Sequence, residues 1–245
     1  MPALRATIIT VGDEIVCGDI RDTNGSYLAA ALTERGAEVV RISQVRDEIE
    51  SIVEEIRLCS KLSSFLIITG GLGPTTDDIT RDAIAKFVGQ PLEMSVPSLE
   101  KIKSIFARRK RKFVSINERQ AYFPRGASIL DNTAGTADAF IVRHDNCHII
   151  SLPGVPLEME RLFVEAVDSY LAKELHLSVQ HFAQTIKCFG LSEAAIGAAV
   201  ESCVLQSAIR VSYRPVFPEV WVKLLVRGTD RKNGTAALED ARKKV

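Results

Sequence analysis

One strand–loop–helix unit in the first third of the chain constrains the fold most. Residues 65–68 form a short apolar run, which is typical of a strand buried on both faces, and residues 79–87 have helical apolar spacing. The loop between them carries Gly70, Gly71 and Gly73, which allow positive φ and let a ligand approach the backbone amides. A glycine loop that leads into a helix N-terminus predicts an anion site.

The same loop also has a purely structural interpretation. Pro74 fixes a turn, and residues 75–78, Thr-Thr-Asp-Asp, supply N-cap chemistry for the helix. The acids favour the functional interpretation, because Asp77, Asp78 and Asp82 would repel a bare phosphate unless a cation lay between them and the ligand. The sequence therefore predicts a divalent cation, Mg²⁺, Mn²⁺ or Co²⁺, with Asp77 and Asp78 as its ligands.

The composition is that of an ordinary globular protein, with 46% apolar and 25% charged residues among 245. Its formal net charge is zero, which argues against binding nucleic acid or an anionic membrane surface. Five scattered cysteines without a C-x-x-C pair disfavour a disulfide framework and a zinc site, and they favour a reducing cytoplasm. Neither a signal peptide nor an apolar run of about 18 residues is found.

Strands and helices alternate over residues 1–175, which predicts a three-layer α/β domain with a mostly parallel sheet. Ligands bind such sheets at the carboxyl ends of the strands, where residues 12–14, Asp47 and the glycine loop are expected. Two helix starts are also predicted: Asn24 as an N-cap, and Asp47 with Glu50 as a capping box. Residues 176–245 read as a small α+β domain of strand, helix, two strands and helix, with the boundary in residues 176–181.

Four segments together resemble the CinA family, in the order and spacing that the family shows. They read VGDEIVCGDIRDTNGSYLAAAL, TGGLGPTTDDITRDAIA, INERQAYFPRGASILDNTAGTA and LPGVPLEME. The resemblance implies a molybdopterin-binding-like domain, as in MogA, MoaB and gephyrin, followed by a KH-type domain. The amidohydrolase domain that follows in many CinA proteins, which deamidates nicotinamide mononucleotide, has no counterpart in this sequence, so we do not expect that activity.

The resemblance also implies roles for individual residues. In the CinA branch the similar domain is associated with metal-dependent hydrolysis of ADP-ribose to AMP and ribose 5-phosphate, and in MogA and plant Cnx proteins with molybdopterin and its adenylylated form. On this basis Asp78 is expected to position metal or water, with Asp47 and Asp77 in support and Lys187 as a counter-charge. The remaining expected substrate and phosphate contacts are Gly12, Asp13, Glu14, Asp22, Asn24, Thr69, Gly70, Gly71, Gly73, Pro74, Thr75, Gly135, Thr136, Pro153, Gly154 and Pro156.

Two departures from the family pattern change the expectations. Asp138 and Ala139 stand where the family usually has Pro-Gly, which is expected to alter the charge and geometry of a loop facing the ligand. In the small domain the turn reads Gly190, Leu191, Ser192, Glu193, not the G-x-x-G that clamps RNA. We therefore expect that domain to serve a homodimer or to close the active site.

Three functions follow in order of expectation. The first is a pyrophosphohydrolase acting on ADP-ribose or a related dinucleotide, and the second is molybdopterin binding or adenylylation in molybdenum cofactor synthesis. The third is a pterin- or nucleotide-binding module without catalysis, which the Asp138 change would allow. Turnover of ADP-ribose in the presence of a divalent metal distinguishes the first from the third.

Overall fold

The computed structural model describes residues 4–177, 181–203, 205–227 and 231–245, which divide into two compact units. The large unit comprises residues 1–32 and 37–177, and the small unit comprises residues 33–36 and 178–245. The predicted boundary segment 176–181 includes residues 178–180, which lie outside the described residues. No helix in the described ranges is both long and apolar enough to span a bilayer.

The large unit is built on a six-stranded sheet with the order β2-β1-β3-β8-β7-β6. β2, β1, β3 and β8 are parallel, whereas β7 and β6 are antiparallel additions at one edge. The strands are β1 (Arg5–Val11), β2 (Glu38–Val45), β3 (Phe65–Thr69), β6 (Ser128–Leu130), β7 (Ala139–His144) and β8 (Cys147–Leu152). The predicted mostly parallel sheet is therefore confirmed.

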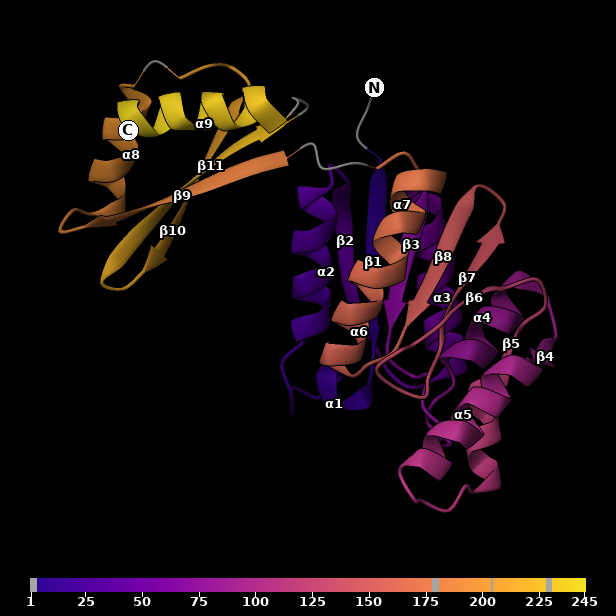
Figure 1. Ribbon diagram of the computed structural model, residues 1–245. Coiled ribbons are helices and arrows are strands. Elements are labelled where there is room, and N and C mark those ends of the chain that lie inside the picture. Colours follow the sequence, from indigo (N-terminus) through magenta and orange to yellow (C-terminus); the bar gives the residue numbers. More distant parts are fainter. Residues whose placement is uncertain (1–3, 178–180, 204, 228–230) are drawn as a thin grey trace. The chain divides into compact units, whose positions relative to one another are not determined.

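Helices cover both faces of this sheet, as the three-layer prediction requires (Figure 1). One core packs Leu28 and Leu32 of α2 and Phe163 against Ile8 and Ile67 of the sheet. The helices of that face are α2 (Thr23–Glu34), α6 (Pro156–Leu162) and α7 (Asp168–Glu174), the last two joined by a π-helical turn at Phe163–Val167. The other core packs α3 (Ile49–Leu62) and α4 (Thr80–Val88) against the alternate side chains of the same strands.

Shorter elements complete the large unit. They are α1 (Asp13–Val16), α5 (Val96–Arg108), a 3₁₀ helix at Ser115–Ala121, and the antiparallel pair β4 (Leu92–Met94) and β5 (Tyr122–Pro124). β3 is completely buried along its length, which explains its continuous apolar sequence. The carboxyl ends of β1, β3 and β8 meet at one edge because these strands are parallel neighbours.

The small unit is a three-stranded antiparallel sheet with the order β10-β11-β9 and two helices. Its elements are β9 (His181–Phe189), α8 (Glu193–Glu201), β10 (Ile209–Val216), β11 (Glu219–Arg227) and α9 (Arg231–Lys244). Ser192 caps α8 by accepting a hydrogen bond from the Ala195 amide at 3.2 Å. Val222, Leu224 and Ala241 are among the residues that fill its own core.

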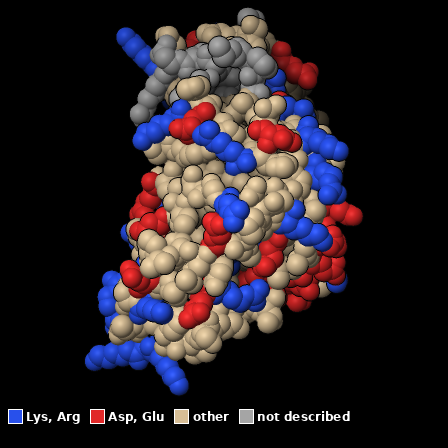
Figure 2. Space-filling view, turned by 90° about the vertical axis from the view of Figure 1, so that its right-hand side faces the viewer, with Lys and Arg blue, Asp and Glu red and all other residues tan. Residues whose placement is uncertain are grey.

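Basic and acidic side chains are interspersed over the face of the molecule shown in Figure 2. All five cysteines are free, and Cys59 and Cys147 are buried.

Candidate functional site

A cleft of about 500 Å³ lies where the predicted site residues gather, at the carboxyl edge of the parallel strands. Most of the predicted residues line it: Gly12, Glu14, Asn24, Asp47, Thr69, Gly70, Gly71, Gly73, Pro74, Asp77, Asp78, Thr136, Pro153 and Gly154. Residues from five separate chain segments thus converge on one hollow, since the sheet brings the loops after β1, β2, β3 and β8 together.

Six predicted residues lie outside the lining of this cleft: Asp13, Asp22, Thr75, Gly135, Pro156 and Lys187. Asp13 and Thr75 flank it, because the Asp13 amide bonds Asp47 and the Thr75 amide bonds Asp78. Pro156 is the first residue of α6. Lys187 lies on β9 of the small unit, with its ammonium 4.8 Å from the Trp221 ring centre, and its role as a counter-charge stays a prediction.

The Asp78 carboxylate closes the glycine loop from within. Its Oδ1 accepts the Gly73 N–H at 2.6 Å, and its Oδ2 accepts the Thr75 N–H at 2.8 Å and the Thr75 hydroxyl at 2.5 Å. The Gly70 amide donates to Leu152 O at 3.1 Å. Three amides of the expected phosphate cradle are therefore already bonded, and Asp78 holds the loop in shape.

The prediction that residues 75–78 cap the next helix, α4 (Thr80–Val88), is wrong, because the Asp78 carboxylate is bonded within the loop. α4 begins at Thr80, its N-cap is Ile79, and no side chain caps it. Asp78 is the residue that capping chemistry would use, but its oxygens face back into the loop. The Gly71 and Leu72 amides make no hydrogen bond to the described residues, which leaves them available to an anion.

Gly70 has no substitute at its position. Its φ is +105°, and a Cβ there would lie 2.2 Å from the backbone oxygen of Val11. The loop can therefore pass this close to the end of β1 only with glycine.

The buried guanidinium of Arg81 binds two carbonyl oxygens of the glycine loop, a role that sequence reasoning missed. Its side chain is 2% exposed, and it donates to Leu72 O and, at 3.3 Å, to Gly73 O. Burial lowers its pKa to about 10, while the nearby Asp78 and Asp82 charges oppose that shift. Because the guanidinium holds these loop carbonyls, it stabilises the loop conformation. A buried arginine cannot be recognised from its place in a Thr-Arg-Asp sequence.

Asn24 is not the N-cap that the sequence predicts. α2 begins at Thr23, and Asp22 caps it by accepting the Gly25 amide at 2.8 Å. Asn24 lies inside the first turn, where its Nδ2 donates to Thr69 Oγ1 at 3.0 Å and to Gly154 O at 2.8 Å. It thereby joins α2 to the ends of β3 and β8, directly beneath the cleft.

Five carboxylates line the cleft: Glu14, Asp47, Asp77, Asp78 and Glu158. The pKa of Asp47 is raised from 3.8, mainly because the carboxyl is partly buried, and also because Glu14, Asp13 and Asp77 repel its charge. The capping box predicted for Asp47 is absent, since α3 begins at Ile49 and the Asp47 Oδ2 accepts the Asp13 amide at 2.9 Å. The pKa of Asp77 is lowered, chiefly by a hydrogen bond from Thr75.

These acids give the cleft the oxygen chemistry that a hard divalent cation prefers. In the part of the chain that the structure describes, no three His, Cys, Asp or Glu side chains are already arranged to hold a metal. Asp77 has the more accessible carboxylate of the two predicted metal ligands, because both oxygens of Asp78 are bonded within the loop. The mutual repulsion around Asp47 is what a bound cation would relieve.

Glu158 is a cleft residue that sequence reasoning did not single out. Asn132, which is 1% exposed, donates from Nδ2 to Glu158 Oε2 at 2.7 Å and to Ala137 O at 2.9 Å. Asn132 Oδ1 in turn accepts the Ala134 and Gly135 amides, so one buried amide fixes both the loop and the acid. A Cβ at Gly135 would lie 2.1 Å from Glu158, which shows how closely the loop packs on this carboxylate.

Asp138 does not alter the charge of the ligand-facing loop, contrary to expectation. Its side chain is buried, it forms an ion pair with Lys101, and it accepts the Asn132 amide at 2.9 Å. The residues of this loop that face the cleft are Thr136 and Ala137. The sequence departure is therefore compensated inside the protein by a lysine 37 positions earlier.

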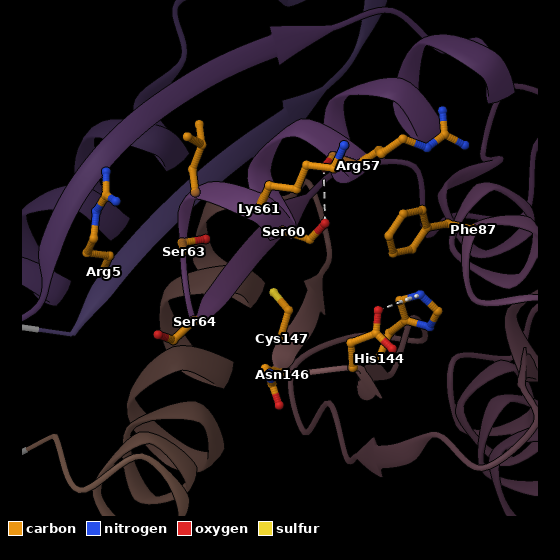
Figure 3. Close-up of a pocket in the computed structure, with 12 residues that line it drawn as sticks. Arg5, Arg57, Ser60, Lys61, Ser63, Ser64, Phe87, His144, Asn146 and Cys147 are labelled. Atoms are coloured by element: carbon orange, nitrogen blue, oxygen red, sulfur yellow. Dashed lines mark hydrogen bonds and ion pairs between the residues drawn. The ribbon is translucent and has the colours of Figure 1, made fainter.

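A second hollow, of about 640 Å³, lies at the opposite edge of the sheet (Figure 3). Arg5, Lys61, Phe87, His144 and Cys147 are among the side chains that surround it. It is larger than the cleft but has neither a glycine loop nor a group of carboxylates. Burial raises the pKa of the Cys147 thiol to about 12, which leaves it protonated and unreactive at neutral pH.

Comparisons with known proteins agree with this architecture. The family model described as "Probable molybdopterin binding domain" matches residues 7–173. A CinA-like protein of Geobacter sp. strain M21 is 36% identical over 228 residues, which are 93% of this chain and 55% of that protein. A CinA-like protein of Citrifermentans bemidjiense is 35% identical over the same shares. The chain spans about half the length of these curated relatives.

A solved structure matches as well. The crystal structure of CinA from Thermoplasma acidophilum has 33% sequence identity and a TM-score of 0.64, and the match covers 68% of this chain and 98% of that one. The α/β fold expected from the glycine-loop motif is therefore confirmed for the large unit.

Proposed function

Since the chain belongs to the CinA family and contains its molybdopterin-binding-like domain, we propose that it is a metal-dependent nucleotide pyrophosphohydrolase that converts ADP-ribose to AMP and ribose 5-phosphate. The observation that carries this proposal is the meeting of an organised glycine loop and five carboxylates in one cleft. In the reaction a water oxygen attacks one phosphorus, the P–O–P bond breaks, and each product keeps one phosphate. The proton of the water passes to a base.

The donor set of the cleft fits a divalent cation. Asp77 and Glu14 would hold the cation, and the chemistry it would supply there is to neutralise the phosphate oxygens and to lower the pKa of a bound water. The free amides of Gly71 and Leu72 would bind diphosphate oxygens. Asp78 acts as a positioning residue, because its bonds to the Gly73 and Thr75 amides fix the loop.

Asp47 is the base that we assign. Burial and the neighbouring acids raise its pKa, which makes its carboxylate a better proton acceptor than an ordinary one. The Asp13 amide fixes one of its oxygens, and Asp47 lines the cleft. Loss of a general base typically lowers a rate by about 10²–10⁴-fold, so Asp47→Asn should reduce kcat by about that factor.

The test is release of AMP from ADP-ribose by the purified chain, with Mg²⁺, Mn²⁺ or Co²⁺ and with FAD, NAD and ATP as competing substrates. Asp47→Asn is compared with Asp145→Asn, a matched change at an exposed turn on the other edge of the sheet. We expect metal-dependent AMP release that Asp47→Asn slows by about 10²–10⁴-fold and Asp145→Asn preserves. Absence of AMP with every metal would overturn the proposal.

A second function is supported by the description of the matching family model, which names molybdopterin binding. In that case the same cleft would hold a pterin, with or without adenylyl transfer from ATP. Binding of a pterin without hydrolysis of ADP-ribose would favour this function or a non-catalytic binding module. A cytoplasmic homodimer remains the expected state of the protein under each of these functions.

A further inference from the structure

The sheet of the small unit has one covered and one open face. Side chains alternate along each strand, and the set that includes Ile186, Tyr213 and Val222 packs with α8 and α9 in the core of the unit. The other set is exposed or partly exposed and forms three cross-strand rows. The rows are Lys187–Trp221–Arg214, Thr185–Lys223–Ser212 and Ala183–Leu225–Arg210. These rows contain two lysines, two arginines and no acid.

The basic side chains of this open face are largely uncompensated. Glu219, two residues before Trp221 on β11, accepts the Trp221 Nε1–H at 2.7 Å and lies 3.8 Å from the Lys187 ammonium. The three other cations of the rows form no ion pair with the described residues. The zero net charge of the whole chain is also unevenly divided, since residues 178–245 contain ten Lys and Arg but six Asp and Glu. The small unit therefore attracts anions locally.

Aromatic rings accompany these cations. Trp221, the single tryptophan of the chain, lies in the middle of the first row, with Lys187 Nζ 4.8 Å and Arg214 Cζ 6.0 Å from the centre of its ring. Phe189, the next residue of β9 on the same face, is 75% exposed, and Phe217 in the β10–β11 turn is 100% exposed. Both phenylalanines lie at one end of the sheet, because Phe189 pairs with the first residue of β11 (Figure 1).

We propose that this open face binds single-stranded nucleic acid, with the cations on the phosphates and a base stacked on Trp221. A positive surface combined with exposed rings suits a single strand, because every nucleotide supplies both a phosphate and a flat base. An acidic protein surface would pair with the cations but leave the rings unused. Binding on this face does not require the turn at residues 190–193, whose sequence lacks the G-x-x-G that clamps RNA.

The experiment follows the fluorescence of the whole chain, to which Trp221 contributes the only tryptophan emission. Single-stranded DNA of about 12 nucleotides, RNA of the same sequence, the corresponding DNA duplex and poly-glutamate are titrated separately. We expect at least one single strand to quench the emission and to bind at least about tenfold more tightly than the duplex, whose bases are stacked inside. Absence of quenching by both single strands, or equally tight binding of poly-glutamate, would overturn the proposal.

Variants separate the phosphate contacts from the stacking, with binding measured by the anisotropy of a labelled strand. Lys223→Gln should weaken binding and lower the slope of log affinity against log salt by about 0.7, whereas Lys173→Gln, at an exposed lysine of α7, should change neither. Trp221→Ala should weaken binding about tenfold, and Trp221→Phe, which keeps a ring, should retain most of the affinity. Unchanged binding in either Lys223→Gln or Trp221→Ala would overturn the assignment of the strand to this face.

Discussion

At the scale of single residues, the Asp47 carboxylate lowers the stability of the fold while it serves the proposed reaction. Its folded-state pKa is raised above 3.8 by burial and by the neighbouring acids, so the ionised side chain opposes folding. That penalty is fully present above the folded pKa, and it disappears as the pH falls through that value and the carboxyl takes up a proton. A group of this kind is typical of a functional site.

Asp47→Asn should therefore raise the free energy of unfolding at pH 7. Asparagine keeps an acceptor for the Asp13 amide but carries no charge. The gain over the wild type should shrink as the pH falls through the folded-state pKa of Asp47, because the wild-type carboxyl then takes up a proton. Calorimetric melting at pH 7 and at a series of lower pH values measures the difference, with Asp145→Asn as the control. If Asp47→Asn is less stable than the wild type at pH 7, the charged Asp47 carboxylate does not destabilise the folded protein.

Asp78 holds the glycine loop through hydrogen bonds from two backbone amides. Asp78→Ala removes the acceptor of the Gly73 and Thr75 amides, and we expect their hydrogen exchange to accelerate at least tenfold. Asp77→Ala, at the neighbouring exposed residue, should leave the exchange of the Gly73 amide unchanged. NMR-detected exchange reads both amides directly. Unchanged protection in Asp78→Ala would show that other contacts hold the loop.

At the scale of elements, a buried ion pair fastens α5 to the loop before β7. Lys101 pairs with Asp138, whose side chain is 3% exposed, and with Asp131 at 2.6 Å. Removing one partner of a buried pair leaves the other charge without compensation, which costs about 3 kcal/mol or more.

Lys101→Met should thus lower the free energy of unfolding by about 3 kcal/mol, and the double variant Lys101→Met with Asp138→Asn should recover a large part of the loss. The control is Lys86→Met, which breaks an exposed pair with Glu50 and should cost less than about 1 kcal/mol. Denaturant unfolding gives all three values. If Lys101→Met and Lys86→Met lower the free energy of unfolding equally, the buried pair contributes no more to stability than the exposed one.

At the scale of the whole molecule, the order of the elements was predictable but the contacts between distant segments were not. Apolar runs and helical spacing identified the buried strand at residues 65–68 and the helix after the glycine loop, because local sequence determines them. The role of Asn24 could not be predicted, because its partner Gly154 lies 130 positions away in the sequence. Asp138 was misjudged and Glu158 was missed for the same reason, because the sequence alone does not show that Lys101 lies beside Asp138 or that Glu158 reaches the cleft.

The central claim is that a cation and a diphosphate meet in the cleft at the carboxyl edge of the sheet. Its most direct test is the anomalous scattering of Mn²⁺ in a crystal of the protein grown with a non-hydrolysable ADP-ribose analogue. We predict a Mn²⁺ peak in contact with the carboxylate of Asp77 or Glu14, and the diphosphate against the amides of Gly71 and Leu72. A peak and a nucleotide placed elsewhere, such as the hollow beside Lys61 and His144, would contradict the account.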